Sequence, residues 1–329
     1  MDSRARVEAA LAGGDVDRPP AGAWGHRYRD EWSPDKLAEV TIDRARKFGW
    51  DFVKFQPRAT FFAEAFGAPY RSAGHALRAP VVDEPTIKDL DDWAALRVVN
   101  QEVLDEQART LGVVARALGD RVPVLQTVFS PLSVASYLVS RENRKMVRQM
   151  RSHPDVVLPA LGRIADALID FSRKSVEAGA AGIFYAISGF ATPDSMPAAV
   201  YDELALPLDL RVLEALPAEA WFNVLHLCGS HINMEVGRKL PVQAVSYSIH
   251  NQGNPSLGEA RRLSGKAVMG GLEQRRVLVG GPPEAIQEQV REAMASTDGG
   301  RGLLLAPGCS VPPQAPDVNL RKMMEAAAA

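Results

Sequence analysis

Short runs of hydrophobic residues alternate with longer stretches of mixed polar and apolar residues along the whole chain. Eight such runs can be counted, most of them rich in Val, Ile, Phe, Leu or Tyr and bounded by Gly, Pro or polar residues. This pattern is typical of buried parallel strands. The runs are Ala21–Gly25, Asp51–Gln56, Val122–Val128, Ala181–Ala186, Phe222–Leu227, Ala244–Ile249, Ala267–Gly271 and Gly302–Ala306.

The stretches between the runs have the periodicity of amphipathic helices. The clearest extends from about Pro154 to Val176, with apolar residues recurring every three or four positions from Val157 to Phe171, as on one helix face. Pro154 suits the first helical position, whereas Pro159 inside is expected to bend or delay the helix. A second helix is predicted to begin at Pro282–Glu284 and to continue through Val290.

Strand and helix alternating eight times predict an α/β fold, a (β/α)₈ barrel that forms a single domain over residues 1–329. An open, doubly wound sheet is the alternative, but it more often carries a Gly-rich phosphate loop after its first strand, and none is present. The segment from Arg58 to Arg121 exceeds one strand–helix unit. We therefore expect extra helices near the N-terminal part of the chain that cover the barrel mouth.

The composition is that of a soluble globular protein, with 46% hydrophobic and 24% charged residues. A net charge of −2 argues against a nucleic-acid partner. The uncharged stretch from Ala178 to Pro193 is too short and too polar to span a membrane, and no apolar signal segment follows Met1. Two cysteines cannot frame a disulfide-based fold of 329 residues, so a reducing cytoplasm is expected.

Candidate chemistry gathers where the predicted strands end, which is where barrel enzymes hold their active sites. His226 and Cys228 are two residues apart on one strand, so their side chains point to the same face. Cys309 follows the last strand, and barrel closure would bring it near them. One imidazole and two thiolates form a three-ligand zinc set with one position open, as in catalytic sites.

Simpler interpretations of these three residues stay open at this point. A single His-x-Cys is a weak signal, buried free cysteines commonly only pack in the core, and Cys228 and Cys309 could form a disulfide. The absence of G-x-S-x-G removes support for serine hydrolysis.

Further rim residues are weaker candidates. His250 ends the neighbouring strand and is a candidate fourth ligand or substrate contact, or simply a polar rim residue. Arg27, within His26-Arg27-Tyr28-Arg29, could hold an anionic substrate or form a structural ion pair. Tyr137 is a candidate rim hydroxyl or a helix residue packed on the barrel. His26, Gln56, Arg58, Tyr185, Ser188 and Glu273 also follow or end predicted strands.

Several segments together resemble the uroporphyrinogen decarboxylase superfamily along nearly the whole chain. They include Asp17-Arg18-Pro19-Pro20, Ser130-Pro131-Leu132 through Tyr137, Glu177-Ala178-Gly179-Ala180-Ala181, Val224-Leu225-His226-Leu227-Cys228-Gly229, Gly270-Gly271-Leu272-Glu273 and Ala306-Pro307-Gly308-Cys309-Ser310. The resemblance implies a (β/α)₈ barrel, in agreement with the strand count.

The chain departs from the decarboxylase branch of that superfamily. Decarboxylases carry Arg-Gln-Ala-Gly-Arg-Tyr where this chain has Ala23-Trp24-Gly25-His26-Arg27-Tyr28. Their essential Asp in a Phe-Ser-Asp motif corresponds to Phe55-Gln56-Pro57, and Pro57 has no carboxylate. Their Gly-His-Gly at the last strand is Gly308-Cys309-Ser310 here.

The other branch contains zinc-dependent methyltransferases that exchange methyl groups between a corrinoid protein and a thiol such as coenzyme M. Their zinc is held by a His-x-Cys pair and a distant Cys, which His226, Cys228 and Cys309 match in type and order. The resemblance implies one catalytic Zn²⁺ and a thiol or methylated small molecule as substrate. No D-x-H-x-x-G motif is present, so the methyl-corrinoid is expected on a separate protein.

Two functions of other classes stay open beside a methyltransferase. One is a decarboxylase of porphyrinogens or other polycarboxylates, which needs no metal, and the other is a non-catalytic barrel that serves as a binding subunit. Metal content distinguishes them. The sequence predicts neither the methyl donor and acceptor nor the oligomeric state.

Overall fold

Seven parallel strands form one sheet in which each strand pairs with the next along the chain. The computed structural model describes residues 1–329. The strands are β1 (Val53–Phe55), β2 (Val124–Phe129), β3 (Gly182–Ser188), β4 (Val224–Cys228), β5 (Ala244–Ser246), β6 (Ala267–Leu272) and β7 (Leu303–Pro307). Because all seven are parallel, their carboxyl ends lie on one side of the molecule.

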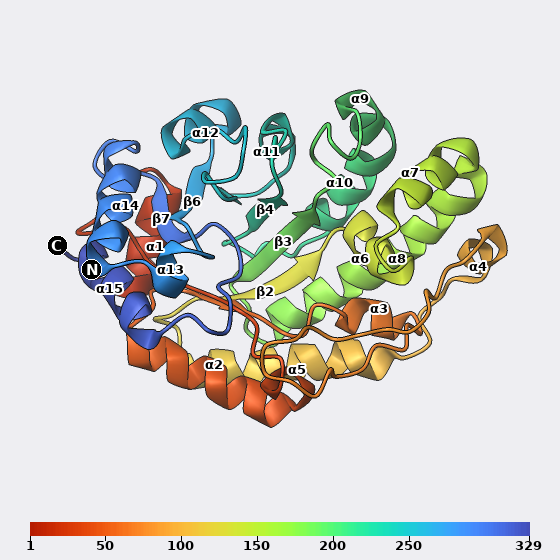
Figure 1. Cartoon of the computed structure of the whole chain (residues 1–329), viewed down its shortest axis with the longest axis horizontal. Coiled ribbons are helices and arrows are strands. Elements are labelled where there is room, and N and C mark those ends of the chain that lie inside the picture. The colour runs from red at the N-terminus through yellow and green to blue at the C-terminus, as the bar shows by residue number, and fades with distance from the viewer.

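Helices connect the strands and cover the outer face of the sheet (Figure 1). The longer ones are α1 (Ser3–Leu11), α2 (Pro34–Phe48), α5 (Gln101–Leu118), α7 (Asn143–Ser152), α8 (Pro154–Glu177), α10 (Leu206–Glu214), α14 (Pro283–Ala295) and α15 (Asp317–Ala327). The shorter ones are η1 (Asp30–Trp32), α3 (Phe61–Ala65), α4 (Leu90–Ala95), α6 (Pro131–Leu138), α9 (Ala198–Val200), η2 (Tyr201–Ala205), α11 (Glu235–Lys239), α12 (Leu257–Ser264) and α13 (Val277–Gly280). No helix is both long and apolar enough to cross a membrane.

The α/β fold with parallel strands is confirmed. The predicted barrel of eight strands is not, because the sheet has seven strands and the first of the eight predicted runs is not one of them. In the first predicted run, Ala21–Gly25, only Ala21 pairs, through an isolated parallel bridge to Leu305 of β7. The Ala21 carbonyl also accepts a hydrogen bond from the amide of Asp51, just before β1. The preceding residue, Pro20, has no N–H to donate, and a side chain at Gly25 would lie 2.2 Å from the Val311 carbonyl. The segment therefore contacts both outer strands without forming a ladder.

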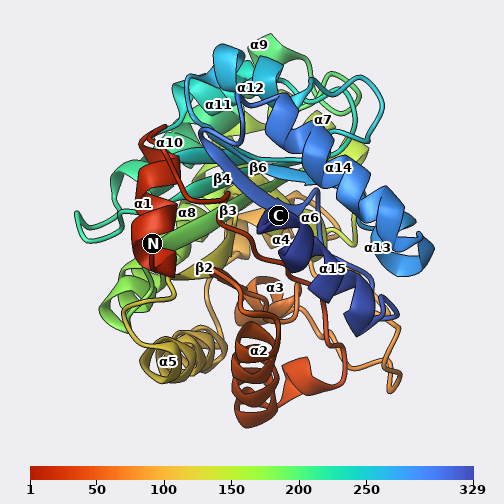
Figure 2. The ribbon, with the colours of Figure 1, turned by 90° about the vertical axis from the view of Figure 1, so that its left-hand side faces the viewer.

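A buried ion cluster holds this first segment against the amino ends of the strands. Asp51 is fully buried, and its carboxylate accepts hydrogen bonds from Arg6 of α1, at 2.6 Å, and from Arg18, also at 2.6 Å. The amide of Ala21 donates to the same carboxylate at 2.9 Å. Figure 2 shows α1 on this side of the sheet, and its Val7 belongs to the apolar cluster inside the sheet.

The two helices predicted in detail are confirmed. The helix predicted over Pro154–Val176 is α8, and the positions predicted for its apolar face, from Val157 to Phe171, are buried. Pro159 lies inside α8 without delaying its start at Pro154. The helix predicted from Pro282–Glu284 is α14.

The extra helices predicted between Arg58 and Arg121 are α3, α4 and α5. The chain between α3 and α4 is tied to α6, which directly follows the carboxyl end of β2. Tyr70 donates its hydroxyl to the carbonyl of Tyr137, and the amides of Thr86 and Ile87 donate to Leu138. In Figure 1, α4 accordingly lies on the same side as α6 and α7.

The strands sort their side chains into two hydrophobic layers because successive residues point to opposite faces. A cluster of 73 buried residues lies between sheet and helices, and a second cluster of 12 lies inside the curved sheet. The inner cluster includes Phe184 of β3 and Val224 of β4. One inward position further toward the carboxyl ends, the side chains become polar, as at Lys54, His226 and Ser246, all buried. This change of polarity marks the floor of the candidate site.

On the outer face, Tyr185 of β3 and Tyr201 of η2 clamp one buried carboxylate. Both hydroxyls donate to Asp209 of α10, Tyr185 at 2.6 Å. The π-helical turn η2 (Tyr201–Ala205) precedes α10 and carries Tyr201. Tyr185 was predicted as a rim residue of the active site, and that prediction is wrong because the side chain points outward from the sheet.

Asp209 gives the fold a testable pH dependence. Burial raises the pKa of Asp209 to about 6 from an ordinary value of 3.8, against the two tyrosine hydrogen bonds that lower it. The native state therefore binds more protons than the unfolded state between about pH 4 and 6. We predict that, as pH rises from 4 to above 6, the free energy of unfolding of the native protein decreases relative to that of Asp209→Asn, by at most about 3 kcal/mol. Denaturant titrations at pH 4 and 7 measure this difference, and parallel pH profiles for both proteins would contradict the prediction.

Candidate metal centre

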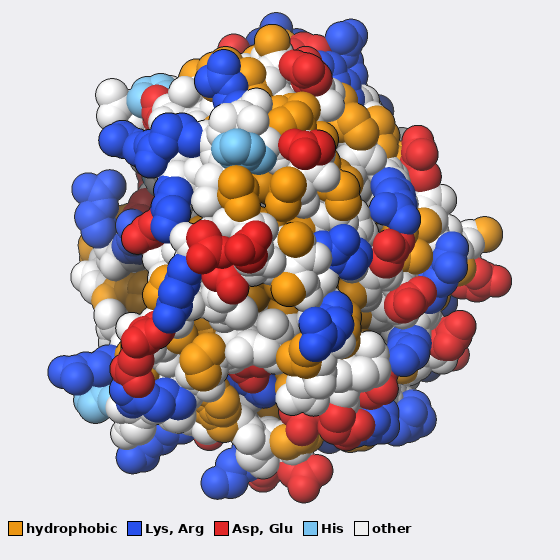
Figure 3. All heavy atoms as spheres, turned by 90° about the vertical axis from the view of Figure 1, so that its right-hand side faces the viewer, with side chains coloured by type: hydrophobic (Ala, Val, Ile, Leu, Met, Phe, Trp, Pro, Cys, Tyr) orange, Lys and Arg blue, Asp and Glu red, His pale blue; other side chains and the backbone are white.

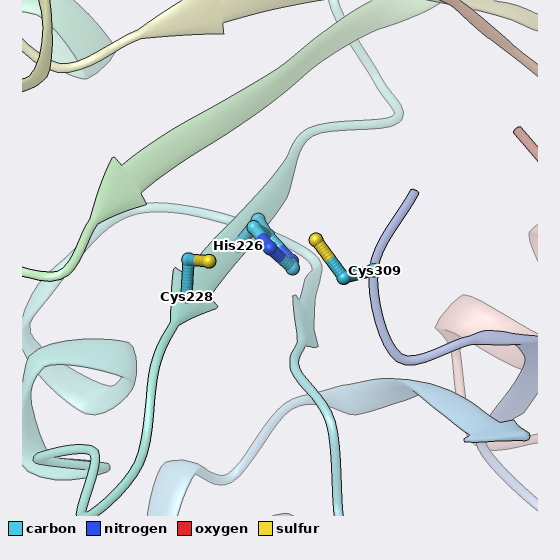
Figure 4. A group of neighbouring side chains, drawn as sticks. All are labelled: His226, Cys228 and Cys309. Atoms are coloured by element: carbon cyan, nitrogen blue, oxygen red, sulfur yellow. The ribbon is translucent and has the colours of Figure 1, made fainter. Parts of the chain in front are cut away.

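Three ligand-type side chains meet at the carboxyl ends of the strands. His226 and Cys228 project from β4 on the same face, and Cys309 comes from the loop after β7 (Figure 4). One ring nitrogen of His226 and both Sγ atoms lie within 4.8 Å of one another. Both cysteines are free, so the disulfide alternative is not what the structure contains. Residues 81 positions apart along the chain thus form one compact group.

Backbone contacts on both sides hold the loop that carries Cys309. The amide of Gly308 donates to Leu272 at the end of β6 at 2.9 Å, and the amide of Val311 donates to the Trp24 carbonyl at 2.8 Å. A side chain at position 308 would lie 2.6 Å from the Cα of Ser248. Only glycine allows this approach, so Gly308 helps to set where Cys309 projects.

The imidazole of His226 is oriented by two neighbours. Its Nδ1 lies 3.2 Å from the hydroxyl of Ser246 on β5, and its ring stacks on Phe184 with centroids 5.2 Å apart. With a metal bound, Nδ1–H can donate to Ser246 and Nε2 presents its lone pair; without a metal, Nε2–H can instead donate to Cys309 while Nδ1 accepts from the Ser246 hydroxyl. The first arrangement, in which the second nitrogen of a histidine is hydrogen-bonded, is the usual one for metal-binding histidines.

Charge in the group is shared unequally between the two thiols. A hydrogen bond from the Cys228 thiol, helped by one from His226, holds the pKa of Cys309 well below its usual range although burial opposes it. The pKa of Cys228 rises in turn, because its S–H is donated to Cys309 and because it is buried. The group therefore holds one thiolate readily, which is the form that binds metals and attacks electrophiles.

The other predicted site residues lie outside this group. The Nε2 of His250 lies 3.1 Å from the carbonyl of Gly271 and is not part of the three-residue cluster. Arg27 pairs with Asp30 at 3.5 Å, and no hydrogen bond or ion pair joins it to the cluster. Roles for Arg27 and His250 in catalysis stay predictions.

Tyr137 of α6 lies in a half-buried aromatic cluster with Tyr70 and Phe129. Its ring stacks on Phe129 with centroids 5.8 Å apart, and the guanidinium of Arg141 lies 4.3 Å from its centroid. Burial raises the pKa of Tyr137, and negative charge on Cys228 and Cys309 adds a smaller increase. The hydroxyl is therefore protonated at neutral pH. Its contact with a substrate stays a prediction.

Figure 3 views the molecule from the side on which α7 lies in Figure 1. Basic and acidic side chains are interspersed over this face, with hydrophobic ones between them (Figure 3). A cavity of about 560 Å³ beside α7 has no hydrophobic lining residue and is bordered by Arg141, Arg144, Lys145, Arg148 and Asp194, among others.

Sequence reasoning missed Lys54, a buried amine on β1. Its side chain is 7% exposed and donates to Gln56. Gln56 and His26, which were noted only as rim residues, continue into a hydrogen-bonded chain that ends at Glu31. The available signal was a charged residue between the apolar Val53 and Phe55, spaced by two from the inward-facing Phe52.

Residues 2–329 of this chain match the family model for uroporphyrinogen decarboxylase (URO-D). A methylcobamide:CoM methyltransferase, MtbA, from Methanosarcina mazei is 25% identical and covers 98% of this chain and 96% of its own length. A methylcobamide:CoM methyltransferase, MtaA, from Methanosarcina barkeri is 23% identical over the same shares. A uroporphyrinogen decarboxylase from Mycobacterium sp. (strain KMS) is 27% identical and covers 81% of this chain and 76% of its own length.

A solved structure described as a methyltransferase from Methanosarcina mazei has the same fold. It aligns with a TM-score of 0.84 at 22% identity and covers 99% of this chain and 98% of its own. The chain belongs to the uroporphyrinogen decarboxylase family, and it is an enzyme. The family resemblance inferred from the sequence is thereby confirmed.

The unequal thiols predict unequal reactivity. In metal-free protein at pH 7, iodoacetamide should modify Cys309 at least several-fold faster than Cys228, because the thiolate is the nucleophile. Peptide mass spectrometry after short exposures measures both rates. His226→Leu removes one donor to Cys309 and should slow its modification. Faster labelling of Cys228 in the native protein would show that the assignment of the thiolate is wrong.

Proposed function

We propose that this member of the uroporphyrinogen decarboxylase family is a zinc-dependent methyltransferase that moves a methyl group between a corrinoid protein and a small thiol. The observation that carries the proposal is the cluster of His226, Cys228 and Cys309, whose ligand atoms lie within 4.8 Å of one another. We further propose that the chain acts as one domain over residues 1–329 and works in the cytoplasm.

The donor set fits zinc. Thiolates are soft ligands, imidazole is intermediate, and two thiolates with one imidazole are a ligand set used by catalytic zinc sites. Three protein ligands leave the fourth position for substrate, whereas structural sites close it. His226 would bind through Nε2, since Ser246 occupies Nδ1. Cys228 and Cys309 would bind as thiolates, and the low pKa of Cys309 favours that form.

A zinc ion held there would supply a positive charge that keeps a substrate thiol in its thiolate form at neutral pH. The chain itself fixes the positions of two of the three proposed ligands. Ser246 and Phe184 hold the imidazole in place, and the contact of Gly308 with Ser248 places Cys309. Tyr137, whose hydroxyl stays protonated, is proposed to contact the substrate.

The methyl group is proposed to arrive on a corrinoid carried by a separate protein, as the names of two relatives suggest. The substrate sulfur forms a bond to the methyl carbon while the carbon–cobalt bond breaks, and its electron pair stays on the cobalt. The proton of the thiol goes to solvent. The reverse direction would use a methylated donor and reduced corrinoid.

Decarboxylation is the second candidate, because relatives named uroporphyrinogen decarboxylase match much of the chain. The carboxylate of the decarboxylases' Phe-Ser-Asp motif is replaced here by Pro57, and the neighbouring Gln56 is engaged by Lys54 and His26. This end of β1 offers no acidic group at that position. A non-catalytic binding role is not favoured by any contact in the structure.

The metal itself is the first test. Native protein purified without chelators and reloaded with zinc should retain about one zinc per chain. Cys309→Ala leaves two ligands on one strand and should lose zinc on dialysis, with affinity falling as pH drops because the thiols must be deprotonated. His250→Ala is the matched control and should keep full stoichiometry, because His250 contacts Gly271 instead. Metal-free native protein, or full stoichiometry in Cys309→Ala, would remove the main support for the proposal.

The reaction is the second test. The zinc-loaded enzyme should transfer the methyl group of methylcobalamin, as a surrogate for the corrinoid protein, to coenzyme M, and Cys309→Ala should slow this by at least about a hundredfold, beyond the range for outer-shell partners. The visible spectrum of the corrinoid reports the rate. Uroporphyrinogen should show negligible turnover, and its conversion at an ordinary enzymatic rate would overturn the methyltransferase assignment in favour of a decarboxylase.

A further inference from the structure

Lys54 is a buried amine without an acidic partner. It projects from β1 into the interior of the curved sheet, is 7% exposed, and forms no ion pair. Its Nζ lies 4.8 Å from the centroid of Phe184 and 5.8 Å from that of Trp24. Burying a cation beside aromatic rings recovers part of its lost hydration, but less than a carboxylate would.

A chain of hydrogen bonds fixes where this amine can lie. The ammonium can only donate, so it engages Oε1 of Gln56, and the amide nitrogen of Gln56 then faces Nε2 of His26 at 3.0 Å. His26 in turn donates from Nδ1 to the buried Glu31 at 2.8 Å. Each donor meets an acceptor along the chain. Lys54 is therefore anchored and not free to swing toward solvent.

The two aromatic residues beside Lys54 also contact the candidate metal centre or the loop that carries Cys309. Phe184, which contacts the amine, also stacks on His226. Trp24, the second ring, accepts through its carbonyl the amide of Val311, two residues after Cys309. Burial lowers the pKa of Lys54 to about 7, and negative charge on Cys309 and Glu31 opposes that decrease. Both negative groups favour the charged form of Lys54.

The net charge of the metal and its ligands determines whether a nearby cation such as Lys54 stabilises the bound substrate. A divalent metal with two thiolates and one imidazole is neutral overall, so a substrate bound as thiolate adds one uncompensated negative charge. A neutral ligand adds none. In a buried site an uncompensated charge is costly, whereas a fixed opposite charge within several ångström stabilises it.

We propose that Lys54 is a positioning residue that supplies the compensating positive charge for a substrate thiolate at the cluster of His226, Cys228 and Cys309. This inference rests on the proposed function, since it requires a metal at the cluster. Lys54 acts through charge and does not touch the methyl group. It makes the site selective for anionic over neutral ligands at the fourth position.

The test compares two ligands of different charge on the metal-loaded protein. With Co²⁺ in place of zinc, the visible spectrum reports binding of 2-mercaptoethanol, which binds as a thiolate, and of imidazole, which binds as a neutral molecule. Lys54→Met removes the charge and approximates the shape. It should weaken 2-mercaptoethanol at least about tenfold, the scale of one charge pair inside a protein, and leave imidazole affinity within about twofold. Cobalt stoichiometry should not change.

Control variants separate charge from structure. Lys54→Gln, which also lacks the charge, should reproduce the loss, and Lys54→Arg should retain a larger share of thiol affinity than either. Lys145→Met removes one positive charge at the rim and should change neither affinity. Equal weakening of both ligands by Lys54→Met and Lys54→Gln would mean that Lys54 is only structural. Unchanged thiol affinity in both would likewise overturn the inference.

The outcomes also separate this inference from the proposed function. If the native protein binds neither zinc nor cobalt at the cluster, the proposed function fails, and Lys54 has no thiolate to balance. If the native protein binds metal and thiol but the Lys54 variants bind the thiol equally well, only the role of Lys54 fails.

Discussion

The parallel arrangement of seven strands, each with side chains alternating between two faces, is the constraint on which the rest of the structure depends. Parallel pairing brings every carboxyl end to the same side, and the two-residue period decides which residues face the interior. On β4 this places Val224 in the inner apolar cluster and then His226 and Cys228 above it. The apolar layer excludes water from below, so the polar groups above it interact in a poorly screened environment. Shifting β4 by one residue would turn both ligand-type side chains toward the helices.

Sequence reasoning could predict much of this because periodicity is a local property. Eight strands and two helices were predicted from patterns within short windows, and the structure confirms seven of those strands and both helices. The shared face of His226 and Cys228 was predicted in the same way. The proximity of Cys309 followed from the expected topology. What local patterns did not reveal depends on tertiary contacts. The segment at Ala21 lacks a ladder because Pro20 has no donor and Gly25 lies against Val311. Tyr185 faces outward because it directly follows Phe184, which faces inward, and successive residues of a strand point to opposite faces. The sequence alone did not show which of the two residues faces the interior.

The environment of Lys54 likewise depends on tertiary contacts that the local sequence pattern does not reveal. Within the run Asp51–Gln56 it looks like an interruption of a strand, and only the folded sheet shows that it occupies the interior beside Phe184 and Trp24. Its partner Gln56 faces His26, which precedes η1, and His26 is bound in turn by Glu31 within η1. A buried network of this kind is assembled from four positions that share no sequence period. Such networks are recognised by satisfied donors and acceptors rather than by pattern.

The departures from the decarboxylase pattern and the buried lysine have a common electrostatic logic. Where decarboxylases resembling this chain carry an Asp after β1, it has Pro57, and where they carry a His after β7, it has Cys309. The first change removes a negative charge near Lys54, and the second introduces a readily ionised thiol whose charge acts on the same amine. Negative charge has thus moved from the end of β1 to the loop after β7, beside His226 and Cys228. A carboxylate at the end of β1 would compete with a thiolate for the charge of Lys54, whereas its absence leaves that charge to the sulfur cluster.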